Sequence, residues 1–167
     1  MPRELEGWRS VQDRGPDGAI GSDERVKATR PVVERSERGA RRLGERYWLE
    51  ITRASRGTVR TRETEEGVEM RLFGRGPCLL RFGRAETAHG PEGVSCRYAI
   101  RGGILTRHPG GAIRLSQTGG DEPELRAAVT GFVPRLHGAL YEQKIQRRLH
   151  VAISRRYFER VIDEERP

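Results

Sequence analysis

From Tyr47 to Leu136, apolar and polar residues alternate in short segments that are separated by glycine-rich turns. Alternation with a period of two places apolar side chains on one face of a β-strand and polar side chains on the other. The segment Val94–Arg101 shows this pattern most clearly. Turn residues recur about every 8 to 12 positions, a spacing typical of antiparallel sandwiches and barrels. The pattern therefore predicts about seven or eight antiparallel strands.

Most of the expected strands end at a cluster of glycine or proline. Residues 89–93 (HGPEG) have the composition of a loop. The glycine pairs at 102–103 and 110–111 lie between strand patterns, so we interpret them as hairpin turns rather than as a phosphate loop, which would lead into a helix. A third pair, at 119–120, precedes the last expected strand. The expected strands cover 47–52, 58–64, 68–72, 78–82, 94–101, 113–115 and 125–129, with 104–109 as a further candidate.

Beyond Pro134 the apolar period changes to that of a helix. Apolar residues recur at intervals of three and four, which places them on one face of an amphipathic helix. The pattern predicts a long helix over residues 140–163 whose apolar face packs on the sheet. His150 lies opposite this face and is expected either at an exposed position or in a small capping contact. The residues of the apolar face are Tyr141, Ile145, Leu149 and Ala152.

Residues 1–45 mix charges with glycine and proline and contain few large apolar side chains. Such a segment cannot bury enough apolar surface to offset the entropy that is lost when a chain becomes ordered. We therefore expect a disordered polar arm over 1–45. The remaining residues, 46–167, are expected to form a single β-rich domain, because domains commonly contain about 100 to 200 residues.

These elements predict a mainly β fold, in which an antiparallel meander forms a barrel or a strongly curved sheet that the C-terminal helix closes. The segment Gly44–Trp48 places a glycine and a tryptophan at the first expected strand, as in calycins. The arrangement resembles the small ligand-binding barrels of the calycin class and, less closely, the helix-grip fold of START-type domains. The resemblance implies an interior that holds an apolar small molecule, and it carries over no individual functional residue.

The chain carries a net charge of +8, with 30 arginines and two lysines. A cationic surface can bind nucleic acid or another polyanion by neutralising its phosphates. No block of like charge occurs, so a solvated surface is the favoured interpretation and polyanion binding is the alternative. The arginines expected on the polar faces of strands include Arg71, Arg97, Arg101 and Arg114.

The expected C-terminal helix carries two arginine doublets, eight residues apart. Eight residues are close to a whole number of helical turns, so the doublets share one edge, where an anion could bind. Nearby carboxylates such as Glu142 and Glu159 favour ordinary ion pairing or solvation instead. The four residues of these doublets are Arg147, Arg148, Arg155 and Arg156.

No set of residues identifies a reaction, a metal site or a cofactor. Cys78 and Cys96 fall on apolar strand positions, where cysteine usually acts as a small buried side chain, although the two could pair if their strands are adjacent. The four histidines lack the spacing of a metal site. The carboxylates of the strand region fall on polar positions or in turns, and the serines lack a nucleophile-elbow context. The sequence therefore gives no support for catalysis.

The meander pattern favours a non-enzymatic module that binds an apolar, lipid-like small molecule in its interior. The alternatives are a basic adaptor for nucleic acid or another polyanion, and a protein-interaction scaffold whose N-terminal arm folds on a partner. No apolar run has the length of a signal peptide or a membrane span, so a cytoplasmic location is expected. The candidate ligand-binding residues are Trp48, Met70, Phe82 and Tyr98.

Overall fold

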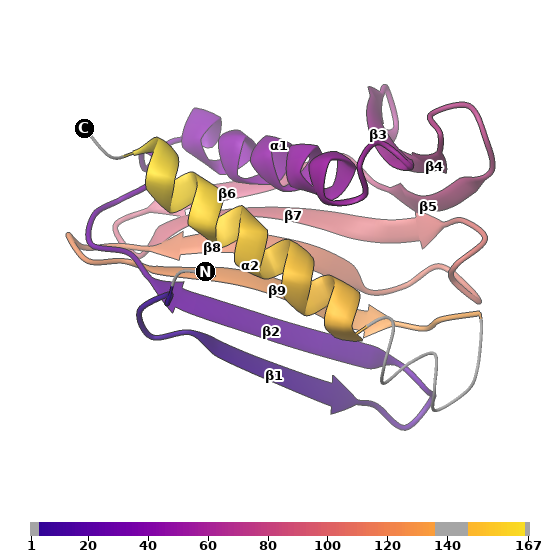
Figure 1. Ribbon diagram of the computed structural model, residues 1–167, viewed down its shortest axis with the longest axis horizontal. Coiled ribbons are helices and arrows are strands. Elements are labelled where there is room, and N and C mark those ends of the chain that lie inside the picture. The colour runs from indigo at the N-terminus through magenta and orange to yellow at the C-terminus, as the bar shows by residue number, and fades with distance from the viewer. Residues whose placement is uncertain (1–3, 136–146, 166–167) are drawn as a thin grey trace.

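The computed structural model describes residues 4–135 and 147–165. Over these residues the chain forms nine strands in one antiparallel sheet and two helices, which lie against one face of the sheet (Figure 1). The helices are α1 (Glu37–Ala54), which follows β2, and α2 (Arg147–Glu164), which follows β9. The strands are β1 (Arg9–Arg14), β2 (Ile20–Lys27), β3 (Val59–Thr64), β4 (Gly67–Leu72), β5 (Cys78–Phe82), β6 (Glu86–Gly90), β7 (Gly93–Gly102), β8 (Ala112–Thr118) and β9 (Glu124–Phe132).

The strand order is β1-β2-β9-β8-β7-β5-β4-β3, and β6 also pairs with β7. Within the described ranges the end strands β1 and β3 do not pair with each other, so the sheet is open and curled and does not close into a barrel (Figure 1). The predicted antiparallel sheet is therefore confirmed in its curved form. The two helices occupy the inside of the curl.

One bend of the sheet lies where β7 changes partners. The first half of β7 pairs with β6, and its second half pairs with β5. Residues 83–85 separate β5 from β6, and the register of the β5–β7 pair shifts between Arg81 and Phe82. Irregularities of this kind bend and twist a strand. As a result, β3, β4 and β5 rise beside the C-terminal end of α1 (Figure 1).

Six of the predicted strands are confirmed, namely β3, β4, β5, β7, β8 and β9. The C-terminal helix is confirmed from Arg147 onward, while residues 140–146 of the prediction lie outside the described residues. The candidate strand at 104–109 is wrong, because this segment contributes only a single bridge, between Thr106 and Pro134. Part of the expected loop at 89–93 belongs instead to β6 and β7.

The predicted first strand at 47–52 is wrong, because these residues lie in the middle of α1. The Ser36 hydroxyl caps the helix by accepting a hydrogen bond from the amide of Gly39 at 3.1 Å. The six residues 47–52 are too few to distinguish the period of a strand from that of a helix. Over the full eighteen-residue helix, the buried positions recur every three or four residues. Leu49, which the strand pattern places inside, is 47% exposed. The glycine and tryptophan of the calycin comparison therefore lie on a helix.

The predicted disordered arm is also wrong, because β1 and β2 belong to the sheet and the boundary at residue 46 falls within α1. β2 pairs along its length with β9, so its order comes from a distant strand that local composition does not reveal. Trp8 contacts Phe158 of α2 edge to face, with ring centroids 6.1 Å apart. The scaffold alternative therefore loses its premise of a disordered segment over 9–27.

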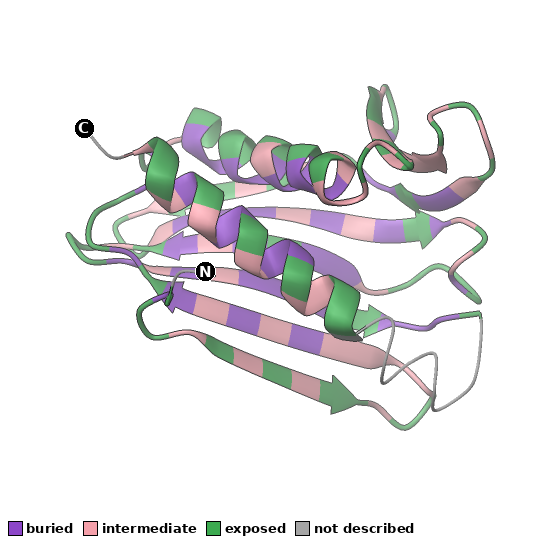
Figure 2. Cartoon of the chain, viewed as in Figure 1, coloured by how far each residue is buried: buried purple, intermediate pink, exposed green. Residues whose placement is uncertain are grey.

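The buried face of α2 differs from the predicted one. Leu149 is 56% exposed and Ala152 is also exposed, while Tyr141 and Ile145 lie outside the described residues. The face toward the sheet and α1 is shifted by about one residue around the helix, as the pattern of buried positions in Figure 2 shows. Its buried residues are Ile153, Ser154, Tyr157, Phe158 and Val161.

The two helices contact each other through aromatic rings and ion pairs. Tyr157 of α2 meets Tyr47 of α1 edge to face at 5.4 Å, and its hydroxyl donates a hydrogen bond to the Leu43 carbonyl at 3.1 Å. Nε of Arg160 lies 3.1 Å from Oε2 of Glu50, a carboxylate that is buried. These contacts fix α2 beside α1 and complete the helical layer.

Gly44 allows α1 to approach the sheet closely. A Cβ atom at this position would lie 2.1 Å from the Tyr98 hydroxyl oxygen and 2.8 Å from two ring carbons of the same residue. Tyr98 is buried in β7 and has little room to move. Glycine is usually unfavourable inside a helix, so its presence here follows from packing.

A carboxyl group is buried beneath α2. Glu24 of β2 is 1% exposed, and it accepts hydrogen bonds from Gln12 at 3.0 Å and from Ser10 and Ser154 at 3.4 Å. Burial, together with the negative charge of Asp23, raises the pKa of Glu24 to about 7, although the serine hydrogen bonds act in the opposite direction. This carboxyl group therefore holds its proton in the folded state over a pH range in which an exposed glutamate is ionised.

The Glu24→Gln variant should differ from the wild type in the pH dependence of stability. Because the folded pKa of about 7 exceeds the ordinary value of 4.5, wild-type stability should fall as pH rises from about 4.5 to above 7. The shift in pKa corresponds to a loss of about 3 kcal/mol in the free energy of unfolding of the wild type. Glutamine does not ionise, so the variant should not show this loss. Urea unfolding between pH 5 and pH 8 measures this. Glu37→Gln, on the exposed surface of α1, is the control, and parallel pH profiles for wild type and Glu24→Gln would contradict the assignment.

Candidate functional site

An apolar cavity lies between the two helices and the inward face of the sheet, at the end where α1 stops and α2 begins. Its volume is about 220 Å³. Alternate residues of a strand face the same side, so the strands supply a wall that is apolar throughout. The residues of this wall, including the loop after β7, are Val59, Met70, Leu79, Leu80, Phe82, Ile100, Leu105, Ile113, Val129 and Phe132.

The helices supply the opposite wall and most of its polar atoms. The Ser55 hydroxyl, at the C-cap of α1, is already engaged, since it accepts from the Val59 amide at 3.0 Å and lies 3.1 Å from the carbonyl oxygen of Thr52. It therefore serves to end the helix and is not free to bind a ligand. The helical lining residues are Tyr47, Ile51, Ala54 and Ser55 from α1 and its cap, and Leu149, His150 and Ile153 from α2.

His150 lines this cavity. Its Nδ1 atom is buried and has no hydrogen-bond partner among residues 4–135 and 147–165. The expectation of an exposed position is wrong, because His150 is half-buried and lies on the same side of α2 as the buried Ile153 and Tyr157. Burial lowers the pKa of His150 below its ordinary value, so the imidazole is neutral near pH 7.

Two of the four predicted ligand-binding residues line the cavity, namely Met70 and Phe82. Trp48 does not line the cavity but contacts Phe82, with ring centroids 4.7 Å apart, and Tyr98, with ring centroids 5.0 Å apart. The structure thus gathers three of the predicted residues into one aromatic cluster, of which only Phe82 reaches the cavity. Trp48 is displaced from the expected lining because it belongs to a helix rather than to a strand.

Several lining residues were not among the predicted ligand-binding residues, although the alternation of the strands would have identified them. Ile100, Ile113 and Val129 all occupy apolar positions of strands that were correctly predicted. The contributions of Ile51 and His150 had no comparable signal, because one segment was assigned to a strand and the other to an exposed helical face.

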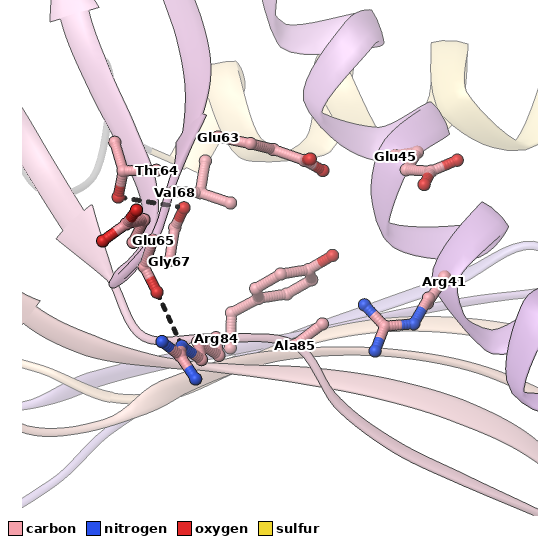
Figure 3. A pocket seen from close by; sticks show the side chains of 10 residues that line it. Arg41, Glu45, Glu63, Thr64, Glu65, Gly67, Val68, Arg84 and Ala85 are labelled. Carbon is pink, nitrogen blue, oxygen red and sulfur yellow. Dashed lines mark hydrogen bonds between the residues drawn. The ribbon is translucent and has the colours of Figure 1, made fainter.

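A second pocket, of about 260 Å³, lies between the first half of α1 and the turn that joins β3 to β4 (Figure 3). Arg41 and Glu45 approach it from α1, and Glu63 approaches it from β3 (Figure 3). Arg84 closes the far side by donating a hydrogen bond to the Glu65 carbonyl at 2.6 Å. Tyr98 also lines this pocket. Charges of both signs alternate around it, so it has no clear preference for either a cation or an anion.

The arginines of the polar strand faces lie on the outer side of the sheet, away from the helices. Two of the four are paired: Nε of Arg71 lies 2.9 Å from a Glu69 oxygen, and Arg97 lies 2.6 Å from Glu86. In the described part of the chain, Arg101 and Arg114 have no carboxylate partner, and Arg114 donates to the Ser95 hydroxyl at 3.4 Å.

The predicted anion site on α2 is only partly described. Arg148 and Arg156 are exposed, and the side chain of Arg147 lies outside the described residues. Arg155 lies 3.4 Å from Glu159, four residues further along the helix, which agrees with the ion pairing considered as the alternative. Anion binding along this edge of α2 therefore stays a prediction.

Other chemistry expected of these residue types does not assemble in residues 4–135 and 147–165. Cys78 and Cys96 are free thiols, and burial raises the pKa of each. No group of three or more histidine, cysteine, aspartate and glutamate side chains is arranged to hold a metal ion in these ranges. Neither described helix is long and apolar enough to cross a membrane.

Comparison of the chain with protein-family models, with curated proteins and with solved structures finds no match. The site must therefore be interpreted from its own chemistry. Of the two pockets described above, the apolar cavity has the more definite chemical character, because nearly all of its lining is hydrocarbon.

Proposed function

We propose that this protein is a non-enzymatic module that binds a small apolar molecule in the cavity between its helices and its sheet. The observation that carries the proposal is the apolar wall from at least six strands, which faces residues of both helices. Ligand sites are concave, mostly apolar and supplied with few polar groups. The arrangement of helices held inside a curled open sheet is closer to a helix-grip architecture than to a calycin barrel.

The volume of the cavity limits the size of the ligand. An apolar cavity of about 150 Å³ in another protein binds benzene. The cavity here, at about 220 Å³, is somewhat larger. The proposal is therefore narrowed from a lipid-like molecule to a single ring or a short branched chain.

Toluene should stabilise the wild-type protein, because a ligand that binds only the folded state raises the free energy of unfolding. At about ten times the dissociation constant, the melting temperature should rise by roughly 3 °C. Thermal unfolding with and without toluene measures this rise, and isothermal titration gives the affinity.

Val129→Phe supplies the test of location, because Val129 lines the cavity and the larger ring should occupy it. This variant should lose the response to toluene. Val11→Phe is the matched control, since Val11 lies on β1 and is 61% exposed. Equal stabilisation of Val129→Phe and wild type, or no wild-type response at saturating toluene, would overturn the proposal.

A second candidate function, binding of a polyanion to the outer face of the sheet, is supported by the exposed Arg101 and Arg114, which lack carboxylate partners among the described residues.

Binding through several phosphates must weaken as salt rises, and the affinity falls by roughly a factor of ten per phosphate contact for each tenfold rise in salt. Titration of a single-stranded oligonucleotide at 50 and 200 mM salt, as rough conditions, measures this slope. A steep slope that the double variant Arg101→Gln, Arg114→Gln reduces is expected, and no binding at low salt would exclude this candidate.

A further inference from the structure

His150, which lines the apolar cavity, carries a buried nitrogen that has no hydrogen-bond partner among the described residues. This nitrogen is Nδ1, and its lack of a partner in the described part of the chain is unusual, because the great majority of buried polar atoms in folded proteins have one. Of the other lining side chains only those of Ser55 and Tyr47 can form ordinary hydrogen bonds, and Ser55 is already engaged with its own backbone neighbours. Leaving a buried nitrogen without a partner costs free energy. A ligand that supplies the missing partner would recover that cost.

We propose that the cavity takes a small apolar molecule that carries one hydroxyl group, such as a phenol, and that this hydroxyl hydrogen-bonds to Nδ1 of His150. The inference rests on the proposed function, because it places a polar contact within the same cavity. Hydrocarbon lining holds the body of the ligand, and His150 fixes the position of its polar end. A phenol is one oxygen atom larger than benzene and fits the available 220 Å³.

The protonation state of His150 favours a neutral ligand. Burial alone lowers the pKa of the imidazole, and no charged group of the described residues contributes to this change. A carboxylate or an ammonium group would therefore enter hydrocarbon surroundings without an opposite charge, at a large cost. A neutral imidazole has one nitrogen that donates and one that accepts. Because a hydroxyl group can do both, it fits Nδ1 in either tautomer.

The test compares phenol with benzene, since the two differ only by the hydroxyl group. The ratio of their dissociation constants is measured by isothermal titration for wild type and for His150→Phe, which keeps a ring of similar size but removes the nitrogen atoms. The preference for phenol should fall about tenfold in the variant, as expected for the loss of one hydrogen bond. His89→Phe, at an exposed position of β6, should leave the ratio unchanged. His150→Asn, which places an amide near the position of Nδ1, should restore part of the preference.

An unchanged ratio in His150→Phe would overturn the inference while benzene binding still supported the proposed function. Failure of both benzene and phenol to bind the wild type would overturn both. If the variant does not fold, the wild type provides the readout through the ¹⁵N chemical shift of His150 Nδ1. Phenol should shift this resonance strongly and benzene should not, and equal responses to the two ligands would contradict the contact.

Discussion

The packing of α1 against the inward face of the sheet is the contact on which the rest of the structure depends. Trp48 contacts both Phe82 and Tyr98, with centroid distances of 4.7 and 5.0 Å, and so joins the helix to β5 and β7. Its neighbour Tyr47 meets Tyr157 of α2. Aromatic rings bury the largest apolar areas of any side chains. This cluster therefore holds both helices to an open sheet whose inner face would otherwise reach water.

The cavity lies where this aromatic cluster ends. Large rings fill the middle of the interface, whereas the lining near the C-terminus of α1 consists mainly of aliphatic side chains such as Ile51, Ile100 and Ile153. The bend of β7 and the rise of β3 to β5 give this end of the sheet its concave form. Well-packed interiors leave few voids larger than a water molecule. An apolar space of this size beside an otherwise dense core is therefore the feature of this fold that most directly suggests a binding function.

Alternation was enough to locate most of the sheet, because one face of each strand is buried and the other is wet. It failed at β2, where the inward-facing Glu24 breaks the apolar phase. It failed again at residues 47–52, because a window of six cannot separate the two periods and only the complete helix does. In the site, strand phase was sufficient for Met70 and Phe82. To predict that His150 lines the cavity, one must know how α2 is rotated about its axis. This rotation depends on the packing of α2 against α1 and the sheet and not on the local period of the sequence.

A crystal structure determined under xenon pressure tests most directly whether the helices and the sheet leave an apolar space that a ligand can occupy. Xenon binds dry apolar cavities of comparable size. The result expected here is a xenon atom inside the cavity, in contact with Ile100, Phe132 and Ile153, with the surrounding side chains unmoved. A structure in which these side chains fill the space, so that no xenon binds there, would contradict the account.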